Sequence, residues 1–372
     1  MKNSSIAGQK EAVNLLEELI LNNRTPHAIL ISGPPGSGQL ALALALASAL
    51  QCESLQGGSA CGTCQACNKS FGLIHPDIHF AFPLIRQDKI AALSSNYMDL
   101  FREQIIANPY IDKKSWIAAL EGENKQANIS AEATREIIQK LSLSHYEGRS
   151  KIMIIWFPEL LGKEGNILLK LIEEPEPDTY LILVTEQEEA ILPTILSRCQ
   201  LIRTRPLNSE DIAHVLEEQM KIGHKKANEI AWLADGNMSE ATRILQNKTE
   251  EHELSVIDWL RCAYKAHPVE MTQWSDAFSK ISREQQKNFL RYGMYFLEQA
   301  LIAQYRGDDY VLLSAAEKET LPKIVPLLPF LVIEKITERL NEDLAALEQN
   351  ANSKILAMAS TLFIHRTLKN RA

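Results

Sequence analysis

The 372-residue sequence lacks the features of a membrane or secreted protein. No apolar run approaches the ~20 residues that cross a bilayer, and residues 1–5 contain no apolar stretch like that of a signal peptide. An excess of positive charge is also missing: the formal net charge is −8, so any nucleic-acid contact would have to be local or supplied by partners. We therefore expect a cytoplasmic, soluble chain with no membrane partner, and its length suggests two or three domains.

Two chemical groups are missing from a loop whose frame is intact. Residues 33–40 read G-P-P-G-S-G-Q-L and keep the spacing of the Walker A phosphate loop, G-x-x-x-x-G-K-[S/T], between a strand-like and a helix-like run. Gln39 replaces the lysine that would reach the β- and γ-phosphates, and Leu40 replaces the hydroxyl that would bind Mg²⁺. The glycines of this degenerate loop are Gly33, Gly36 and Gly38. We expect the loop to be non-functional in ATP hydrolysis.

The acids of a second nucleotide motif are missing as well. Residues 151–155 resemble a Walker B strand, which in a working ATPase ends in an Asp that orders Mg²⁺ and a Glu that aligns water. Trp156 and Phe157 occupy those two places, and Glu159 follows only after Pro158, so we do not expect it to substitute. Two independent losses indicate an inactive nucleotide site.

Four of the six cysteines fall within sixteen residues and predict a metal site. Two adjacent C-x2-C steps are typical of zinc ligands. The four are Cys52, Cys61, Cys64 and Cys67, with the spacing C-x8-C-x2-C-x2-C. Four thiolates fill a tetrahedron and leave no position for a reacting water, so we expect structural Zn²⁺. The alternative is a loop of free thiols, because a reducing compartment disfavours disulfides.

The pattern of apolar runs changes near residue 206. Before it, strand-like and helix-like runs alternate, which predicts an α/β domain whose parallel sheet is covered on both faces. The strand-like runs are 27–32, 77–82, 151–156, 180–185 and 199–203, and the helix-like runs are 41–50, 131–141, 166–173 and 192–196. Beyond residue 206 the runs are all helical. The stretch 83–128 is too long for an ordinary connection and predicts a partly helical insertion of unassigned role.

Three further segments match the signatures of one protein family. Residues 166–175, N-I-L-L-K-L-I-E-E-P, are similar to N-A-L-L-K-x-L-E-E-P-P, and residues 180–185 are similar to a sensor 1 strand that ends at Thr185. The triplet Ser197-Arg198-Cys199 matches a Ser-Arg-Cys motif. Together with the degenerate phosphate loop and the cysteine cluster, these motifs resemble the clamp-loader AAA+ ATPases of bacterial DNA polymerase III. The resemblance is specific from about residue 8 to residue 245.

A third loss follows from the same resemblance. Residues 236–241, G-N-M-S-E-A, are similar to the sensor 2 pattern G-x-x-R-x-A of active relatives. Ser239 stands at the arginine place, and Arg243 comes one helical turn later, where it would need a different geometry. The insertion 83–128 departs from the family pattern.

The resemblance also implies an architecture and a function. The implied domains are an AAA+ domain (1–205) with a zinc-binding loop (52–67) and the insertion (83–128), a small helical lid (206–250) and a helical collar (251–372). The chain would brace a ring of five subunits that loads the sliding clamp onto primed DNA, without hydrolysing ATP itself. Its partners would be the ATPase subunits (tau/gamma) and the delta subunit, with clamp and DNA reached through the complex. Arg198, between Ser197 and Cys199, would be an arginine finger acting in trans on a neighbour's ATP.

Other interpretations of these residues remain open from sequence alone. The helix 166–173 could merely pack through its apolar stripe, and Arg198 could be an ordinary surface arginine. At the level of the whole chain, one rival is an ATPase with atypical Walker residues, which Gln39 and Leu40 argue against on charge. A second rival is a zinc-dependent DNA-binding module. The net charge of −8, with no basic or aromatic stripe near the cysteines, argues against it.

Overall fold

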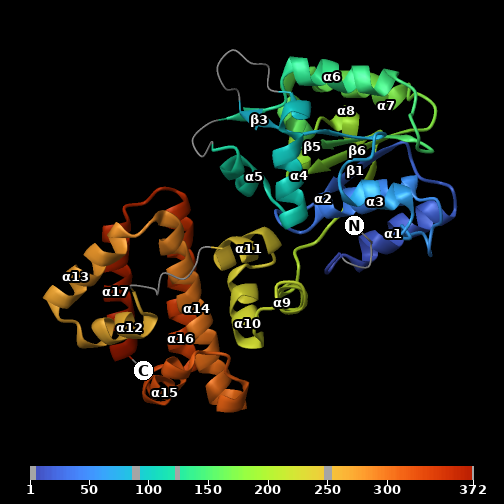
Figure 1. The fold of residues 1–372 in the computed structure, drawn as a ribbon. Coiled ribbons are helices and arrows are strands. Elements are labelled where there is room, and N and C mark those ends of the chain that lie inside the picture. Colours follow the sequence, from blue (N-terminus) through green and yellow to red (C-terminus); the bar gives the residue numbers. More distant parts are fainter. Residues whose placement is uncertain (1–5, 86–92, 122–125, 247–253, 371–372) are drawn as a thin grey trace. The chain divides into compact units, whose positions relative to one another are not determined.

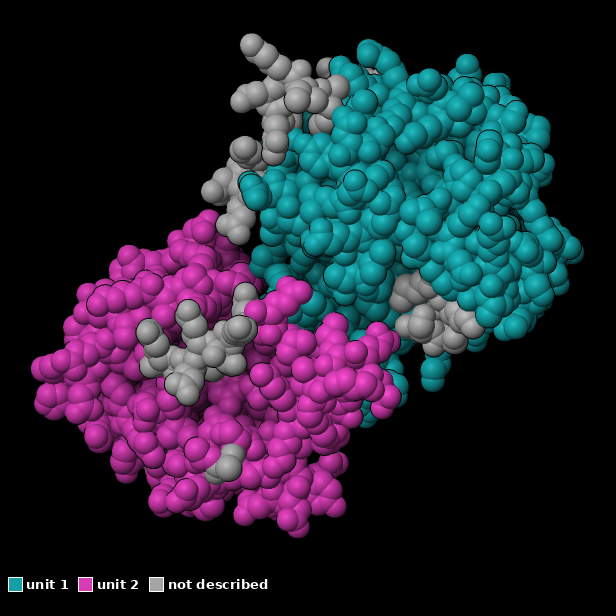
Figure 2. Space-filling view, in the orientation of Figure 1, with its two compact units in different colours: residues 1–215, 234–243 teal, residues 216–233, 244–372 magenta. Residues whose placement is uncertain are grey.

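The computed structural model describes residues 6–85, 93–121, 126–246 and 254–370. In this part of the chain two compact units form, drawn in different colours in Figure 2. Unit 1 contains Met1–Val215 and Ala234–Arg243, and unit 2 contains Leu216–Leu233 and Ile244–Ala372. Each unit has its own core and is described by itself.

A parallel sheet forms the centre of unit 1 (Figure 1). Within the described residues it has five strands in the order β2-β5-β6-β1-β7. The strands are β1 Ala28–Ser32, β2 Ile78–Ala81, β5 Lys151–Trp156, β6 Thr179–Thr185 and β7 Gln200–Arg203. All five were predicted from their apolar runs, because strands covered on both faces carry continuous Val, Ile and Leu. The α/β class predicted for this part of the chain is confirmed.

Alternate residues of each strand enter two different cores, as the period of a strand requires. In β1, Ile29 and Ile31 pack on one face with helices α1 and α2, the cysteine loop and the insertion. Ala28 and Leu30 pack on the other face with helices α6, α7 and α8. We call the first the loop face, because the phosphate loop leads into its helix α2. We call the second the arginine face, because Arg198 follows its helix α8.

The helices of unit 1 lie on both faces of the sheet (Figure 1). They are α1 Lys10–Leu21, α2 Gln39–Gln51, α3 Gln65–Phe71, α4 Met98–Ala107, α5 Lys113–Ala119, α6 Ala131–Ser142, α7 Asn166–Glu173 and α8 Pro193–Leu196, with 3₁₀ turns η2 Ser94–Tyr97, η3 Pro158–Gly165 and η4 Glu188–Ala190. Helix α6 is capped by Ser130, whose Oγ accepts the Ala133 N–H at 3.1 Å. The insertion is partly helical, as predicted, and adds the short antiparallel strands β3 Leu84–Ile85 and β4 Ala127–Asn128.

Unit 2 is helical throughout its described residues. Its helices are α10 His224–Leu233, α12 Val256–Lys265, α13 Pro268–Lys280, α14 Arg283–Arg306, α15 Ala315–Ile324, α16 Phe330–Glu348 and α17 Ser353–Lys369, with 3₁₀ turns η5 Asp308–Tyr310 and η6 Val325–Leu327. Trp259 stacks on Trp274 at 4.9 Å between ring centroids, and its indole N–H donates to Thr361 Oγ1 at 2.9 Å. The predicted helical C-terminal region is confirmed.

Two helices cross from one unit to the other. Helices α9 Ser209–Glu218 and α11 Met238–Gln246 each have residues in both. The predicted lid, 206–250, is therefore shared between the units, and its boundary at residue 250 lies outside the described residues. The division into three domains stays a prediction. Among the described residues, no helix has the length and apolarity that crossing a membrane would require.

Candidate functional site: a closed phosphate loop and an exposed arginine

The degenerate phosphate loop lies between β1 and α2 and is bonded to itself. Gln39, at the lysine place, is 5% exposed, and its Nε2 donates to the carbonyl oxygens of Gly33 at 2.5 Å and Pro34 at 2.8 Å. Ser37 is also buried, and its hydroxyl bonds Thr204 Oγ1 at 2.7 Å. Leu40 is in the core of the loop face. The side chains that would meet phosphate and Mg²⁺ therefore face the protein interior instead.

Two glycines of the loop are in close contact with other segments of unit 1. Gly36 and Gly38 have φ angles of +67° and +97°, which glycine adopts without strain. A Cβ on Gly36 would lie 1.8 Å from Asn237 Oδ1, and a Cβ on Gly38 would lie 2.9 Å from the ring of Tyr110. The Met238 N–H also donates to the Gly36 carbonyl at 3.1 Å. The start of α11 and the insertion thus cover the loop.

Aromatic rings fill the end of β5, where the Walker B acids were missing. Trp156 and Phe157 are buried, with ring centroids 4.7 Å apart. Phe157 has a φ of +60°, which is rare for a bulky residue. Phe101 and Trp116 of the insertion pack at 6.1 and 6.0 Å from Trp156. Trp156 and Phe157 themselves cannot ligate a metal, because an indole and a phenyl ring provide no oxygen.

The sensor 1 position is bonded to a glutamate. Thr185 is fully buried, and its Oγ1 donates to Glu159 Oε2 at 3.0 Å. Burial raises the pKa of Glu159 above its usual value. Burial also raises the pKa of the neighbouring Glu186 to about 7, although this carboxylate accepts the Lys113 N–H at 3.0 Å. Thr185 is thus bonded to a buried carboxyl group of the same unit.

The sensor 2 segment contacts the insertion. Ser239, at the arginine place, bonds Ser115 Oγ at 2.9 Å and accepts the Asp112 N–H at 3.3 Å. Arg243, one helical turn later, pairs with acidic side chains: its Nη2 lies 2.8 Å from Asp112 Oδ2, and its Nη1 contacts Glu240. The Ser239 hydroxyl and the Arg243 guanidinium are thus both bonded to other residues of unit 1.

Arg198, by contrast, has a partly exposed side chain. It follows α8 on the arginine face, and its side chain is 42% exposed. Its guanidinium forms an ion pair with Glu173, the last residue of α7, at 2.8 Å between Nε and Oε1, and it also donates to the Thr194 carbonyl at 3.1 Å. Ser197 Oγ accepts a longer bond from it at 3.3 Å. The arginine is held by groups of its own face but remains open to solvent.

Cys199 completes the motif by packing. It contacts the core of the arginine face, and burial raises the pKa of its thiol to about 11, so the thiol stays protonated near neutral pH. Cys199 thus packs beneath the turn that contains Arg198 as a neutral thiol.

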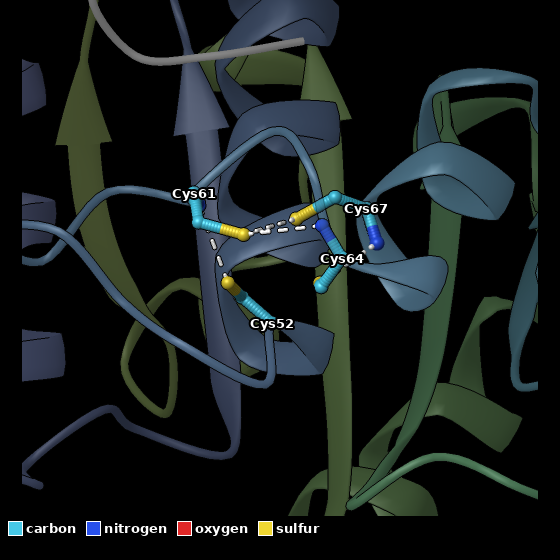
Figure 3. A group of neighbouring side chains, drawn as sticks. All are labelled: Cys52, Cys61, Cys64 and Cys67. Carbon is cyan, nitrogen blue, oxygen red and sulfur yellow. Dashed lines mark hydrogen bonds between the residues drawn. The ribbon is translucent and has the colours of Figure 1, made fainter.

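The four clustered cysteines converge as their spacing predicted (Figure 3). Their Sγ atoms all lie within 4.8 Å of one another, and those of Cys61 and Cys67 are 3.8 Å apart. Tetrahedral bonds of about 2.3 Å require sulfur separations of about 3.8 Å, so the set fits a zinc-sized ion. The cluster joins Cys52, which directly follows α2, to the cap and first turn of α3.

Backbone N–H groups around the cluster favour thiolates. The N–H groups of Thr63 and Cys64 donate to Cys61 Sγ, and these bonds lower the pKa of Cys61 to about 5. Cys64 Sγ accepts the N–H of Cys67, and Cys52 Sγ accepts that of Cys61. Burial raises the pKa values of Cys52 and Cys67, and a cation among the four sulfurs would offset that effect.

Several of these contacts were missed by sequence reasoning. Tyr110 and Asp112 lie in the insertion, which had no assigned role, and Glu173 was read only as part of a family signature. One local signal was available for Asp112, because an Asp three residues before Ser115 is a common helix cap. Its partner Arg243 is 131 residues away, and no local pattern indicates such a pairing.

Comparison with known proteins gives a family for this arrangement. A family model described as DNA polymerase III, delta subunit, matches residues 8–208, more than half of the chain. DNA polymerase III subunit delta' of Bacillus subtilis is 30% identical over 64% of this chain and 60% of its own, and that of Yersinia pestis is 28% identical over 47% of this chain and 41% of its own. DNA polymerase III subunit tau of Escherichia coli is 25% identical over 64% of this chain and 31% of its own. The chain thus matches less than two thirds of the length of each of these relatives.

Proposed function

The chain belongs to the DNA polymerase III delta subunit family, and from this premise we propose that it is a clamp-loader subunit that does not hydrolyse ATP. Its partners would be the ATPase subunits (tau/gamma) and the delta subunit, with primed DNA and the sliding clamp reached through the complex. The relatives named delta' and tau support this assembly. The chain would brace the loader ring, with 206–250 as a lid and the helices after residue 251 as a collar.

The absence of hydrolysis is supported by the condition of the phosphate loop. Hydrolysis needs a cation at the β- and γ-phosphates, a metal held by oxygen ligands and a group that orients water. Gln39 bonds the loop itself, Leu40 is in the core, and Trp156 and Phe157 close the end of β5. A different residue accounts for the loss of each of these groups, so no single substitution would restore the reaction.

The contribution to catalysis would come from Arg198. The observation that supports it is a half-exposed guanidinium held by a single exposed carboxylate, Glu173, in the Ser-Arg-Cys motif of the family. Exposed ion pairs contribute only about 0–1 kcal/mol, so a neighbour's phosphate could displace Glu173 at little cost. The planar fork of an arginine can then meet two phosphoryl oxygens as charge develops on them.

The test is reconstitution of the loader with Arg198 variants. An arginine finger is worth about 10³–10⁵ in rate at the site it completes, and the whole-complex effect should be smaller where other sites keep their own arginines. Arg198→Ala should slow DNA- and clamp-stimulated ATP hydrolysis while leaving assembly intact. Arg198→Lys should restore little, because an ammonium is a point charge without the fork.

A matched control is available on the same chain. Arg205 is also exposed and forms an ion pair with one glutamate, Glu11, at 2.9 Å. Arg205→Ala should therefore leave the ATPase rate unchanged in the same reconstitution. Full activity of the Arg198→Ala complex would show that Arg198 is only structural and that the subunit is a passive brace.

The cysteine cluster would hold one structural Zn²⁺. Cys52, Cys61, Cys64 and Cys67 supply four sulfurs at a suitable separation, and their backbone donors stabilise thiolates. When bound, the ion would cross-link the end of α2 to α3, a segment too short to build a core of its own. With four protein ligands it would have no position for a substrate.

A further inference from the structure

The insertion contributes its own short segment to the region beside the phosphate loop. Residues 108–116 run from the end of α4 into the first turn of α5 and are fixed at their far end by Trp116, whose indole N–H donates to the Pro83 carbonyl at 2.8 Å. The Trp116 ring meets Phe82 edge-on at 5.2 Å, and Phe101 stacks on Phe82 at 4.2 Å. This aromatic packing holds the segment firmly at the end of the sheet where the loop lies.

Tyr110 covers the N-terminal end of α2. Its ring lies against Gly38, the residue that precedes the helix, and the side chain is buried. Its hydroxyl accepts the Ala7 N–H at 2.7 Å, which ties the ring to the N-terminal segment as well. A helix N-terminus after a glycine-rich loop is the usual place for a phosphate, because its free N–H groups point there. Here a phenol ring packs against the glycine at that helix end.

Asp112 provides a buried negative charge in the same segment. The residue is 3% exposed, and its carboxylate accepts the Ser115 N–H at 2.8 Å and pairs with Arg243 at 2.8 Å. Asn237 Nδ2 lies 3.5 Å from the same carboxylate, and Asn237 Oδ1 is the atom next to Gly36. Burial raises the pKa of Asp112, but Arg243 and the Ser115 N–H outweigh it and lower the pKa below its usual value.

These contacts link three segments that are distant in sequence. The phosphate loop bonds the start of α11 through Gly36 and Met238, and α11 bonds the insertion through Ser239 and Arg243. We propose that residues 108–116 are a built-in occupant of the nucleotide region, in which the buried Asp112 carboxylate is the anion that holds Arg243 and so ties the start of α11 to the insertion. The insertion thereby keeps the loop and the start of α11 in one state, with or without nucleotide.

This inference deepens the proposed function, because it explains how a subunit without ATP keeps a fixed shape. It does not depend on clamp loading for its test. Hydrogen exchange of the isolated full chain reports opening of residues 33–40 and 237–243 directly. A failure of Arg198 in reconstitution would leave this measurement untouched, so the two proposals can fail separately.

The first experiment removes the charge of Asp112. Asp112→Asn keeps the shape of the side chain but leaves Arg243 without its buried partner, so exchange at residues 33–40 and 237–243 should accelerate at least about tenfold. Asp99→Asn is the matched control, because Asp99 also pairs with an arginine of the insertion, Arg102, at 2.7 Å but is fully exposed. It should leave both segments unchanged. Equal exchange in the two variants would overturn the proposal.

The second experiment uses the unmodified chain and does not depend on whether a variant folds. Millimolar ADP with Mg²⁺ should leave the exchange of residues 33–40 unchanged, because Tyr110 and Asp112 already occupy the region. Protection of that segment by ADP would show an open site and would overturn the proposal. Tyr110→Phe, which removes only the bond to the Ala7 N–H, should accelerate exchange near residue 38 by a smaller factor than Asp112→Asn does.

Discussion

The two faces of the sheet differ in how their polar groups are satisfied. On the loop face, Gln39 and Asp112 are buried and bonded to groups of the same unit. On the arginine face, Arg198 and Glu173 pair with each other but keep about half of their side-chain surface exposed. A buried group whose hydrogen bonds are made inside the protein would have to break them to bind a ligand, whereas an exposed ion pair can exchange partners at low cost.

The difference indicates the direction in which this subunit would act. With residues 108–116 occupying its own nucleotide region, as proposed, its chemistry would be available only to a neighbour, through the surface that presents Arg198. The chain would then lack the Walker residues that act on its own nucleotide and keep Ser197-Arg198-Cys199, which would act on a neighbour's nucleotide. Substitutions that affect one face and spare the other test this difference between the faces most directly.

The largest expected effect is loss of metal from the cysteine cluster, which lies on the loop face. Structural zinc is worth about 10–16 kcal/mol in isolated finger peptides, and the module here has little core of its own. Cys64→Ser should lower the zinc content measured by metal analysis and should accelerate hydrogen exchange in residues 52–71. The turn at Arg198 should keep its protection, because it packs on the separate core of the arginine face. The strands should keep theirs too, because alternate residues of each strand belong to that core.

A chelator-free preparation of the unmodified chain is the control for that prediction. It should contain close to one zinc per chain. A preparation without zinc but with a protected cysteine loop would show that the module is stable as free thiols.

Much of the fold could be predicted from sequence, because the signals were local. Continuous apolar runs predicted β1 and β5. The cysteine spacing predicted a convergence that the structure contains. Helices α1 and α3 were missed: α1 begins without a side-chain cap, and α3 is a short helix inside the metal loop.

The closed state of the nucleotide region could not be predicted in the same way. Its motifs showed which groups were missing, but not what filled the space. Asp112 meets Arg243 across 131 residues, and Tyr110 meets Gly38 across an insertion with no recognised motif. Such pairings depend on how the chain folds back on itself, and a single sequence contains no periodicity that reports it. The partner of Arg198 was unpredictable for the same reason.

An intermediate effect is expected for the charge of Glu186 on the loop face. Its pKa is raised by burial to about 7, so the folded state binds its proton more tightly than the unfolded chain does. Stability should therefore fall as pH rises from about 4.5 to 7 and stay low above that range. Glu186→Gln should stabilise the protein at pH 8 by about 1–2 kcal/mol, with the gain vanishing near pH 4.5. Denaturant unfolding at several pH values measures this.

Glu188 provides a control of opposite sign. Its carboxylate accepts two bonds from Arg203, at 2.9 and 2.6 Å, and these lower its pKa. The stability it contributes is present above the unfolded pKa and is lost as pH falls through the folded pKa, so Glu188→Gln should weaken the protein at neutral pH. The same sign for both variants would contradict the burial of Glu186.

The smallest expected effect concerns Glu173, which holds Arg198 in the free subunit. Because the pair is exposed, Glu173→Gln should change the free energy of unfolding by less than about 1 kcal/mol. In the reconstituted loader it should raise the ATPase rate by a factor of about 2–5, since the guanidinium no longer has to leave a carboxylate before it meets a phosphate. The neighbouring Glu174→Gln should leave the rate unchanged. A rate that falls as it does for Arg198→Ala would mean that Glu173 aims the arginine at the phosphate, and the ion pair would then be part of the working geometry rather than a resting one.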